Sequence, residues 1–290
     1  MKSKFFIIFL IILNQLQELR SQNGLPQNAG ARGAAMGNAA LCFKDVASLY
    51  ANQAGIAFLE GYHFSAYGER RFLSEGMNLF QFAAAANYSK IGSFGLQINY
   101  FGFDQYNEQK IGLAYARKLA KNFSMSVQFD YLATRIPEYG VSSSFTAEIG
   151  LLADLSPKVS LAAHVYNPLM SKINDQNLPT LLAFGVMYKP SEKFLVSGQL
   201  EKDIFSNPFT GRFGMEYTPI KNLAIRLGII AGQPLMVSLG LGVVLQSLRI
   251  DIASSYHQIL GFTPSLSVSY GFKPQPKAAK KEEKEYENPF

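Results

Sequence analysis

Few residues in this chain have side chains suited to catalysis or metal binding. Among its 290 residues there is one cysteine, Cys42, and there are three histidines, His63, His164 and His257. A single cysteine cannot form an internal disulfide, and no Cys or His cluster has the spacing of a zinc, haem or iron–sulfur site. No histidine lies in a recognisable nucleophile motif, so we expect the histidines at interfacial or surface positions. The sequence predicts a protein that is not an enzyme and uses no cofactor or metal.

Charged residues form a second set, placed on the polar faces of segments that otherwise alternate with apolar residues. They are Asp130, Glu148, Glu201, Arg212, Glu216, Arg226, Arg249 and Asp251. Because both signs are present, we expect an internal ion-pair network bracing a lumen rather than a filter for ions of one sign. A substrate path is the alternative. The net charge of +6 comes without a Lys/Arg stripe with interleaved aromatics, so no nucleic-acid partner is expected.

The segments that carry these charges alternate with a period of two. Met125–Tyr131 places large apolar side chains at every odd position and polar ones between them, and Phe94–Tyr100 and Leu223–Ile229 repeat the pattern. Alternation of this kind gives a strand one apolar and one polar face. A soluble β-sandwich also alternates. However, strands of about 9–12 residues with charge and glycine on the polar face favour tilted strands that span an outer membrane.

Tight turns give the strand count. Six occur between apolar strand ends, at Tyr188–Phe194, Tyr217–Leu223, Leu155–Val159, Arg117–Phe123, Ser89–Gly92 and Leu245–Leu248. Outer-membrane barrels have an even strand number and short periplasmic turns. Six turns with both chain ends on the same side require seven hairpins. The prediction is therefore an all-β fold, a 14-stranded antiparallel transmembrane outer-membrane β-barrel with a small N-terminal plug.

The opposite connections are expected to be short, apart from one roomy connection at Asn167–Pro179. Tyr188, Tyr217, Tyr270 and Phe272 all precede a Pro-containing turn or exit, so we expect them at one depth, as an aromatic girdle in contact with outer-membrane lipid.

Residues 1–21 have the pattern of a signal peptide. Lys2 and Lys4 precede an apolar run, Phe5–Leu13, which is too short for the roughly 20 residues that cross a bilayer as a helix but long enough for a secretory signal. We place cleavage after Ser21, with a retained amphipathic helix as the alternative. The mature chain is then expected in the outer membrane of a Gram-negative bacterium.

Two further segments lie outside the predicted barrel of residues 59–272. Residues 22–58 do not alternate and are rich in small side chains, so we expect them to form a plug in the barrel mouth. Residues 273–290 combine dense mixed charge with proline, which predicts a disordered periplasmic tail. The tail is either a solvated end without a role or a tether that offers Tyr286 and Phe290 to a partner.

The N-terminal segment resembles the PorV/PorQ group of Bacteroidota outer-membrane proteins, within the wider FadL-like barrel superfamily. The resemblance rests on a GxRxxxMGxA-like opening, an acidic residue and a Tyr-x-Asn-Pro-Ala-Gly-like motif. The matching residues are Gly30, Arg32, Met36, Gly37, Ala39, Asp45, Tyr50, Asn52, Ala54 and Gly55. Gln53 replaces the proline of that motif, so the local turn is expected to differ.

The resemblance implies one of two functions. PorV/PorQ-like members serve type IX secretion or the associated surface attachment. On that basis we expect an accessory subunit of a protein secretion or outer-membrane assembly complex, with a larger outer-membrane or periplasmic partner and with both chain termini periplasmic. FadL-like transporters instead pass hydrophobic molecules through a kinked barrel wall, with the N-terminus as a movable hatch. A channel for small hydrophobic compounds is therefore the alternative, and an apolar pocket beside the plug would favour it.

Overall fold

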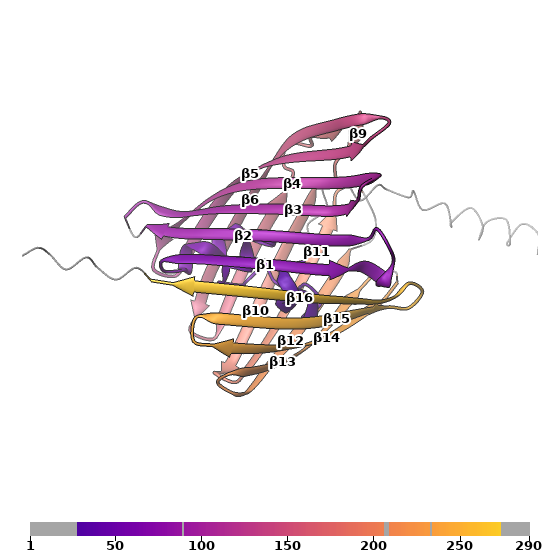
Figure 1. The fold of residues 1–290 in the computed structure, drawn as a ribbon. Coiled ribbons are helices and arrows are strands. Elements are labelled where there is room, and N and C mark those ends of the chain that lie inside the picture. The colour runs from indigo at the N-terminus through magenta and orange to yellow at the C-terminus, as the bar shows by residue number, and fades with distance from the viewer. Residues whose placement is uncertain (1–27, 89, 206–208, 233, 274–290) are drawn as a thin grey trace, which may run out of the picture.

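The computed structural model describes residues 28–88, 90–205, 209–232 and 234–273. The predicted signal peptide, residues 22–27 of the predicted plug and the predicted tail beyond Lys273, with Tyr286 and Phe290, therefore lie outside the described residues. Fourteen strands pair in a closed barrel in which β1 meets β16, and every neighbouring pair is antiparallel (Figure 1). This confirms the predicted 14-stranded barrel. Closure matters because an open sheet edge in lipid would leave backbone groups unpaired.

The strands differ in length, from eight residues in β7 to 17 in β6. In chain order the barrel strands are β1 Tyr62–Arg70, β2 Asn78–Tyr88, β3 Gly92–Phe103, β4 Tyr106–Ala120, β5 Phe123–Ile136, β6 Gly140–Ser156, β7 Val159–Tyr166, β10 Leu181–Ser191, β11 Phe194–Asp203, β12 Thr210–Ile220, β13 Leu223–Ala231, β14 Met236–Leu245, β15 Leu248–His257 and β16 Gly261–Phe272. All six predicted tight turns join consecutive strands at one end of the barrel, called here the turn end. No described helix is long and apolar enough to span a membrane.

The two faces of the wall follow the alternation in the sequence. In β5, Gln128 and Asp130 are buried while Phe129 between them is 65% exposed. An outward apolar face and an inward polar face suit a barrel in lipid. Near the turn end Tyr188, Tyr217, Tyr270 and Phe272 are partly exposed on the outside, and Phe272 stacks on Tyr62 with ring centroids 5.4 Å apart.

Residues 28–59 lie inside the barrel and are called here the inner segment (Figure 1). It consists of helix α2 (Gly30–Ala35) and the 3-10 helices η1 (Val46–Tyr50) and η2 (Gln53–Phe58). Its small side chains allow close approach to the wall, and most of the segment is fully buried. Helix α2 contacts β13 to β16 and η2 contacts β3 to β6, so the segment reaches across the lumen.

The one roomy connection, between β7 and β10, folds back on the end of the barrel opposite the turns. It contains a short hairpin of β8 (Lys172–Ile173) and β9 (Gln176–Asn177), which the sequence pattern did not indicate. Asn167 is fully buried with a φ of 55°, and its side-chain amide donates to the carbonyls of Leu178 and Pro179. Leu178 and Ile173 then pack on Leu132 of the inner wall.

Candidate functional site

Arg32 on α2 attaches the inner segment to the wall through a two-point ion pair. Its Nε and Nη2 donate to the two carboxylate oxygens of Glu216 on β12, each at 2.9 Å, and its Nη1 donates to Asp45 at 2.8 Å. The guanidinium also lies 4.2 Å from the ring centroid of Phe43. Burial by itself would lower the pKa of Arg32, but the two carboxylates outweigh it and raise that pKa above its ordinary value.

Lys44 and Asn52 attach the segment on the other side of the lumen. Lys44 Nζ donates to both oxygens of Asp154 on β6 at 2.6 Å. Asn52 precedes η2 and accepts from the backbone nitrogen of Ala54, while its amide donates to the carbonyls of Leu41 and Leu151. Asn52 therefore caps a helix and ties it to β6 at the same time.

Gln53, which replaces the proline of the motif, opens η2 and is fully buried. Its Nε2 donates to Glu148 on β6 at 2.7 Å and to the carbonyl of Leu49 at 3.1 Å. Proline could make neither bond, so the departure from the motif adds a link between segment and wall.

The other motif residues are all placed in the inner segment. Gly30 begins α2 with a φ of +64°, and Gly37 has a φ of +60° with its nitrogen donating to Ser238 at 3.1 Å. The Asp45 side chain caps η1 by accepting from Ala47. The buried motif side chains, with the close-packed glycine of η2, are Met36, Ala39, Tyr50, Ala54 and Gly55.

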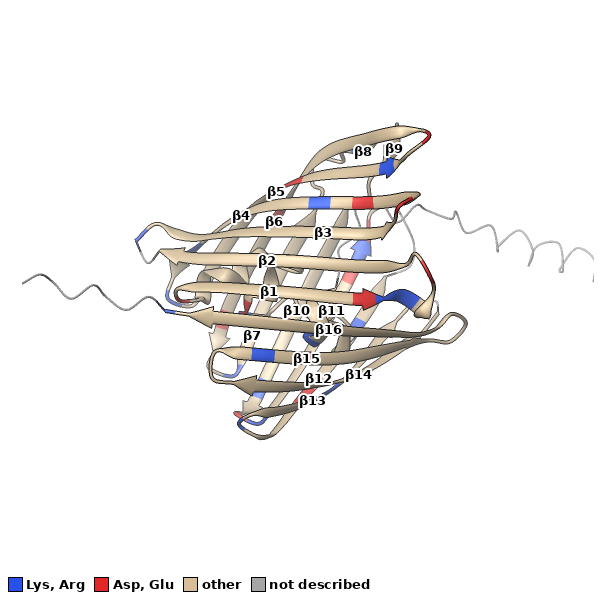
Figure 2. Ribbon diagram, in the orientation of Figure 1, with Lys and Arg blue, Asp and Glu red and all other residues tan. Residues whose placement is uncertain are grey.

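The eight charged residues singled out in the sequence fall into three groups in the lumen. Glu216, Arg226, Arg249 and Asp251 form one group together with Arg32, with Arg226 bridging Glu216 at 2.6 Å and Asp251 at 2.9 Å. Figure 2 shows the basic and acidic residues of the barrel scattered over several strands.

The second group pairs Glu201 with Arg212 at 3.0 Å. The third contains Asp130 and Glu148 with two residues that were not among the eight, Lys110 and His164. Lys110 Nζ contacts Glu148 and lies 3.4 Å from Asp130.

His164 does not lie at the interfacial or surface position predicted for the histidines. It is 5% exposed and its Nε2 lies 2.9 Å from Glu148. The expectation of an interfacial or surface site is wrong for this residue because its parity in β7 matches that of the buried Ser160, Ala162 and Tyr166. The same parity rule would have found Lys110, which shares the inward face of β4 with Gly112 and Ala114. No group of metal-binding side chains occurs among the described residues.

Glycines on the inner wall make room for the inner segment. A Cβ at Gly228 on β13 would lie 2.0 Å from the nitrogen of Gly37, and one at Gly214 on β12 would lie 2.5 Å from the carbonyl oxygen of Met36. Any side chain at these positions would collide with backbone. The polar-face glycines seen in the sequence are therefore contact points for residues 36 and 37.

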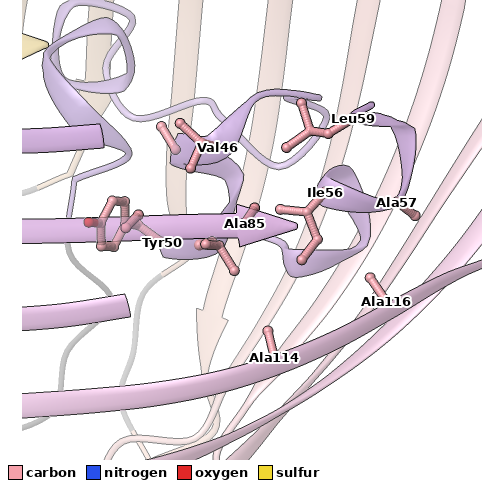
Figure 3. Close-up of a cluster of buried hydrophobic side chains, with 11 residues drawn as sticks. Val46, Tyr50, Ile56, Ala57, Leu59, Ala85, Ala114 and Ala116 are labelled. Atoms are coloured by element: carbon pink, nitrogen blue, oxygen red, sulfur yellow. The ribbon is translucent and has the colours of Figure 1, made fainter. Parts of the chain in front are cut away.

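Apolar contacts complete the attachment. Val46, Tyr50, Ile56 and Leu59 of the inner segment pack on the small alanines of the wall, including Ala85, Ala114 and Ala116 (Figure 3). A second cluster joins Leu41 and Cys42 to Leu152, Ala162 and Ala183 of β6, β7 and β10. Burial raises the pKa of the Cys42 thiol to about 12.

The outer wall carries an apolar groove of about 610 Å³ over the same strands. Its lining combines large side chains such as Leu161, Phe184 and Leu200 with small residues such as Ala163 and Gly198. Behind this part of the wall lie Leu41 and Cys42 of the inner segment. Apolar residues thus lie on both sides of the wall at β6, β7 and β10, toward the lipid and toward the interior.

Comparison with known proteins identifies the fold class. No protein-family model and no curated protein matches the chain. Among solved structures it is similar to the Ralstonia pickettii toluene transporter TbuX, with 13% identity and a TM-score of 0.67 over 85% of this chain and 99% of that one. The Pseudomonas putida toluene transporter TodX matches with 11% identity and a TM-score of 0.65, over 84% and 96%. A Pseudomonas aeruginosa FadL homologue matches with 13% identity and a TM-score of 0.61, over 86% and 99%.

The chain is therefore an outer-membrane-type transmembrane β-barrel with the FadL-like fold. At these identities the likeness is one of fold, and membership of the PorV/PorQ group stays a prediction.

Proposed function

We propose that this barrel is an outer-membrane channel for small hydrophobic compounds, with the inner segment as its gate. The observation that carries the proposal is the presence of apolar residues on both sides of the wall at β6, β7 and β10, in the outer groove and at Leu41 and Cys42. Transfer of an apolar compound into such surroundings is favoured by roughly 25 cal/mol for each Å² removed from water. Neighbours of the same fold are described as toluene transporters, which supports this substrate class.

The inner segment is suited to gating because it reaches across the lumen and yet is held by separable contacts. Its polar attachments to the wall include Arg32–Glu216, Lys44–Asp154 and Gln53–Glu148. Strand pairing from β6 through β7 and β10 to β11 is continuous apart from shifts beside two tight turns. A kinked wall, which the resemblance implied, is not present in these strands, so passage requires the inner segment to move.

A reversible lock tests the gate directly. A Cβ at Gly30 would lie 3.8 Å from the Cβ of Ser267 on β16, close to the mean separation in a disulfide. Gly30→Cys with Ser267→Cys, made in a Cys42→Ser background, should tether α2 to the wall when oxidised, despite about 1–2 kcal/mol of strain at the left-handed φ.

Uptake of a radiolabelled monoaromatic hydrocarbon is then measured in an outer-membrane host without a channel of this fold. Uptake is expected to exceed that of the empty host, to fall to that level on oxidation and to return on reduction, with Ser267→Cys in the same Cys42→Ser background as the control. Uptake equal to the empty host overturns the channel, and equal rates in the oxidised and reduced states overturn the gate.

The accessory-subunit function rests on the resemblance of the inner-segment motif. Its residues Arg32, Asp45 and Asn52 hold the inner segment in place, a role that suits either function. Purification from native membranes in gentle detergent separates the two: a stoichiometric large partner, lost when residues 273–290 are deleted, supports the subunit, and a monomer carrying a hydrophobic ligand supports the channel.

A further inference from the structure

A hollow of about 870 Å³ opens at the turn end, between the inner segment and three neighbouring tight turns. Each of these two-residue turns contributes one exposed lysine: Lys121 between β4 and β5, Lys158 between β6 and β7, and Lys193 between β10 and β11. We call this hollow the lysine crater. Figure 2 shows basic residues at several of the turns.

The lysine crater has an excess of positive charge. Seven basic and four acidic residues line it, and the acids are engaged in ion pairs, such as Asp154 with Lys44 at 2.6 Å and Glu192 with Lys189 at 2.8 Å. In the described parts of the chain, Lys121, Lys158 and Lys193 have no ion-pair partner. Three unpaired ammonium groups around one hollow form a site for a ligand with several carboxylates.

The sequence itself contains such a ligand. Residues 282–290 read Glu-Glu-Lys-Glu-Tyr-Glu-Asn-Pro-Phe, with four glutamates, Glu282, Glu283, Glu285 and Glu287, against one lysine, and they directly follow Lys280 and Lys281. The last described residue, Lys273, lies at the turn end, where its Nζ contacts Glu60 and it lines a hollow that adjoins the lysine crater through Arg32, Asp45 and Arg249.

The connecting chain is long enough to reach the crater. Nine Cα steps separate residues 273 and 282, which span at most about 30 Å when extended. Fourteen strands about 4.8 Å apart and tilted by about 40° close into a barrel roughly 28 Å across. Every point on the turn end is therefore within reach of Glu282.

We propose that the acidic segment 282–290 docks in the lysine crater of its own barrel, through its glutamates and Lys121, Lys158 and Lys193. The tether raises the local concentration of the segment to the order of millimolar, so exposed ion pairs that are individually weak suffice to hold it. The proposal is independent of what passes through the barrel.

Amine footprinting of the full chain in lipid nanodiscs tests the docking. At low ionic strength, Lys121, Lys158 and Lys193 are expected to be acetylated at least three-fold more slowly than in a chain ending at Lys273. Lys90, which lies in the β2–β3 turn outside the crater, should react at the same rate in both. Changing the four glutamates to glutamine, or adding 1 M NaCl, should abolish the protection because both remove the electrostatic attraction.

Carbodiimide cross-linking identifies the occupant. In a mixture of isotopically light and heavy chains, cross-links from segment 282–290 to the three crater lysines should join residues of the same chain. Equal acetylation rates in the full and shortened chains would overturn the proposal. So would mixed light–heavy cross-links, which assign the crater to a second copy, or protection that persists in the glutamine variant, which assigns it to another ligand.

Discussion

Substitution of Arg32 by methionine should release the inner segment without unfolding the barrel. Methionine keeps much of the apolar contact with Phe43 but removes the bonds to Glu216 and Asp45. Breaking a buried ion pair typically costs about 3–5 kcal/mol because one charge is left uncompensated. Here Glu216 keeps Arg226 at 2.6 Å, and the side chain of Asp45 is 30% exposed. We therefore expect a smaller cost, about 2–3 kcal/mol.

Cys42 provides the assay. Its side chain is fully buried in the inner segment, so alkylation requires the segment to open. With rapid opening and closing, the alkylation rate is proportional to the open population. A cost of about 2–3 kcal/mol corresponds to a roughly 30- to 150-fold faster reaction in Arg32→Met at fixed pH.

Arg212→Met is the matched control because Arg212 pairs with Glu201 and both belong to the wall. Its alkylation rate should stay near that of the unchanged protein. The reasoning is refuted if Arg32→Met leaves the rate unchanged, or if both variants accelerate it equally.

Three further predictions concern the same segment. Gly228→Ala should raise the rate of Cys42 alkylation roughly 5- to 150-fold, since overpacking against backbone costs about 1–3 kcal/mol. Gly198→Ala, whose Cβ would meet nothing nearer than 3.8 Å, should leave that rate unchanged. Equal alkylation rates in the two variants would contradict the close contact of Gly228 with residues 36 and 37. Asn52→Ala removes the cap of η2 and the bond to Leu151, so hydrogen exchange in residues 30–58 should accelerate by the equivalent of about 2–3 kcal/mol, and unchanged exchange would argue against the attachment. The pKa of Cys42 is raised to about 12, against about 8.5 in an unfolded chain, so the buried neutral thiol stabilises the inner segment fully below about pH 8.5 and this stabilisation is lost as the pH rises toward 12. At pH 10 hydrogen exchange should show the segment weakened by about 2 kcal/mol. Cys42→Ser, which cannot ionise, should show no such loss.

The sequence alone was sufficient to predict the strands and tight turns of the barrel wall. Period-two alternation and the six tight turns predicted the strand number and every hairpin at the turn end, because both signals depend only on neighbours along the chain. The β8–β9 hairpin was not predicted because its strands are two residues long and its buried anchor, Asn167, looks like an ordinary loop residue in the sequence.

The interior was less predictable because its contacts join distant residues. Arg32 and Glu216 are 184 positions apart, and no local pattern relates them. The grouping of the lumen charges, the role of Gln53 and the glycines that face residues 36 and 37 likewise depend on where the inner segment lies. His164 and Lys110 differ in this respect, since strand parity alone assigns both to the inner face.

The position of the inner segment constrains the order of assembly. Ala31 donates its backbone N–H to Ser267 on β16, while Lys44 donates to Asp154 on β6, so strands from the middle and from the last part of the described chain enclose residues 28–59. The seam between β1 and β16 joins Tyr62 to Phe272, and it can form only after the last strand has been made. Such non-local pairing is slow, and a barrel that closed first would exclude its own interior. We therefore expect residues 28–59 to take their place before the sheet closes, so variants that loosen them should lower the yield of folded barrel.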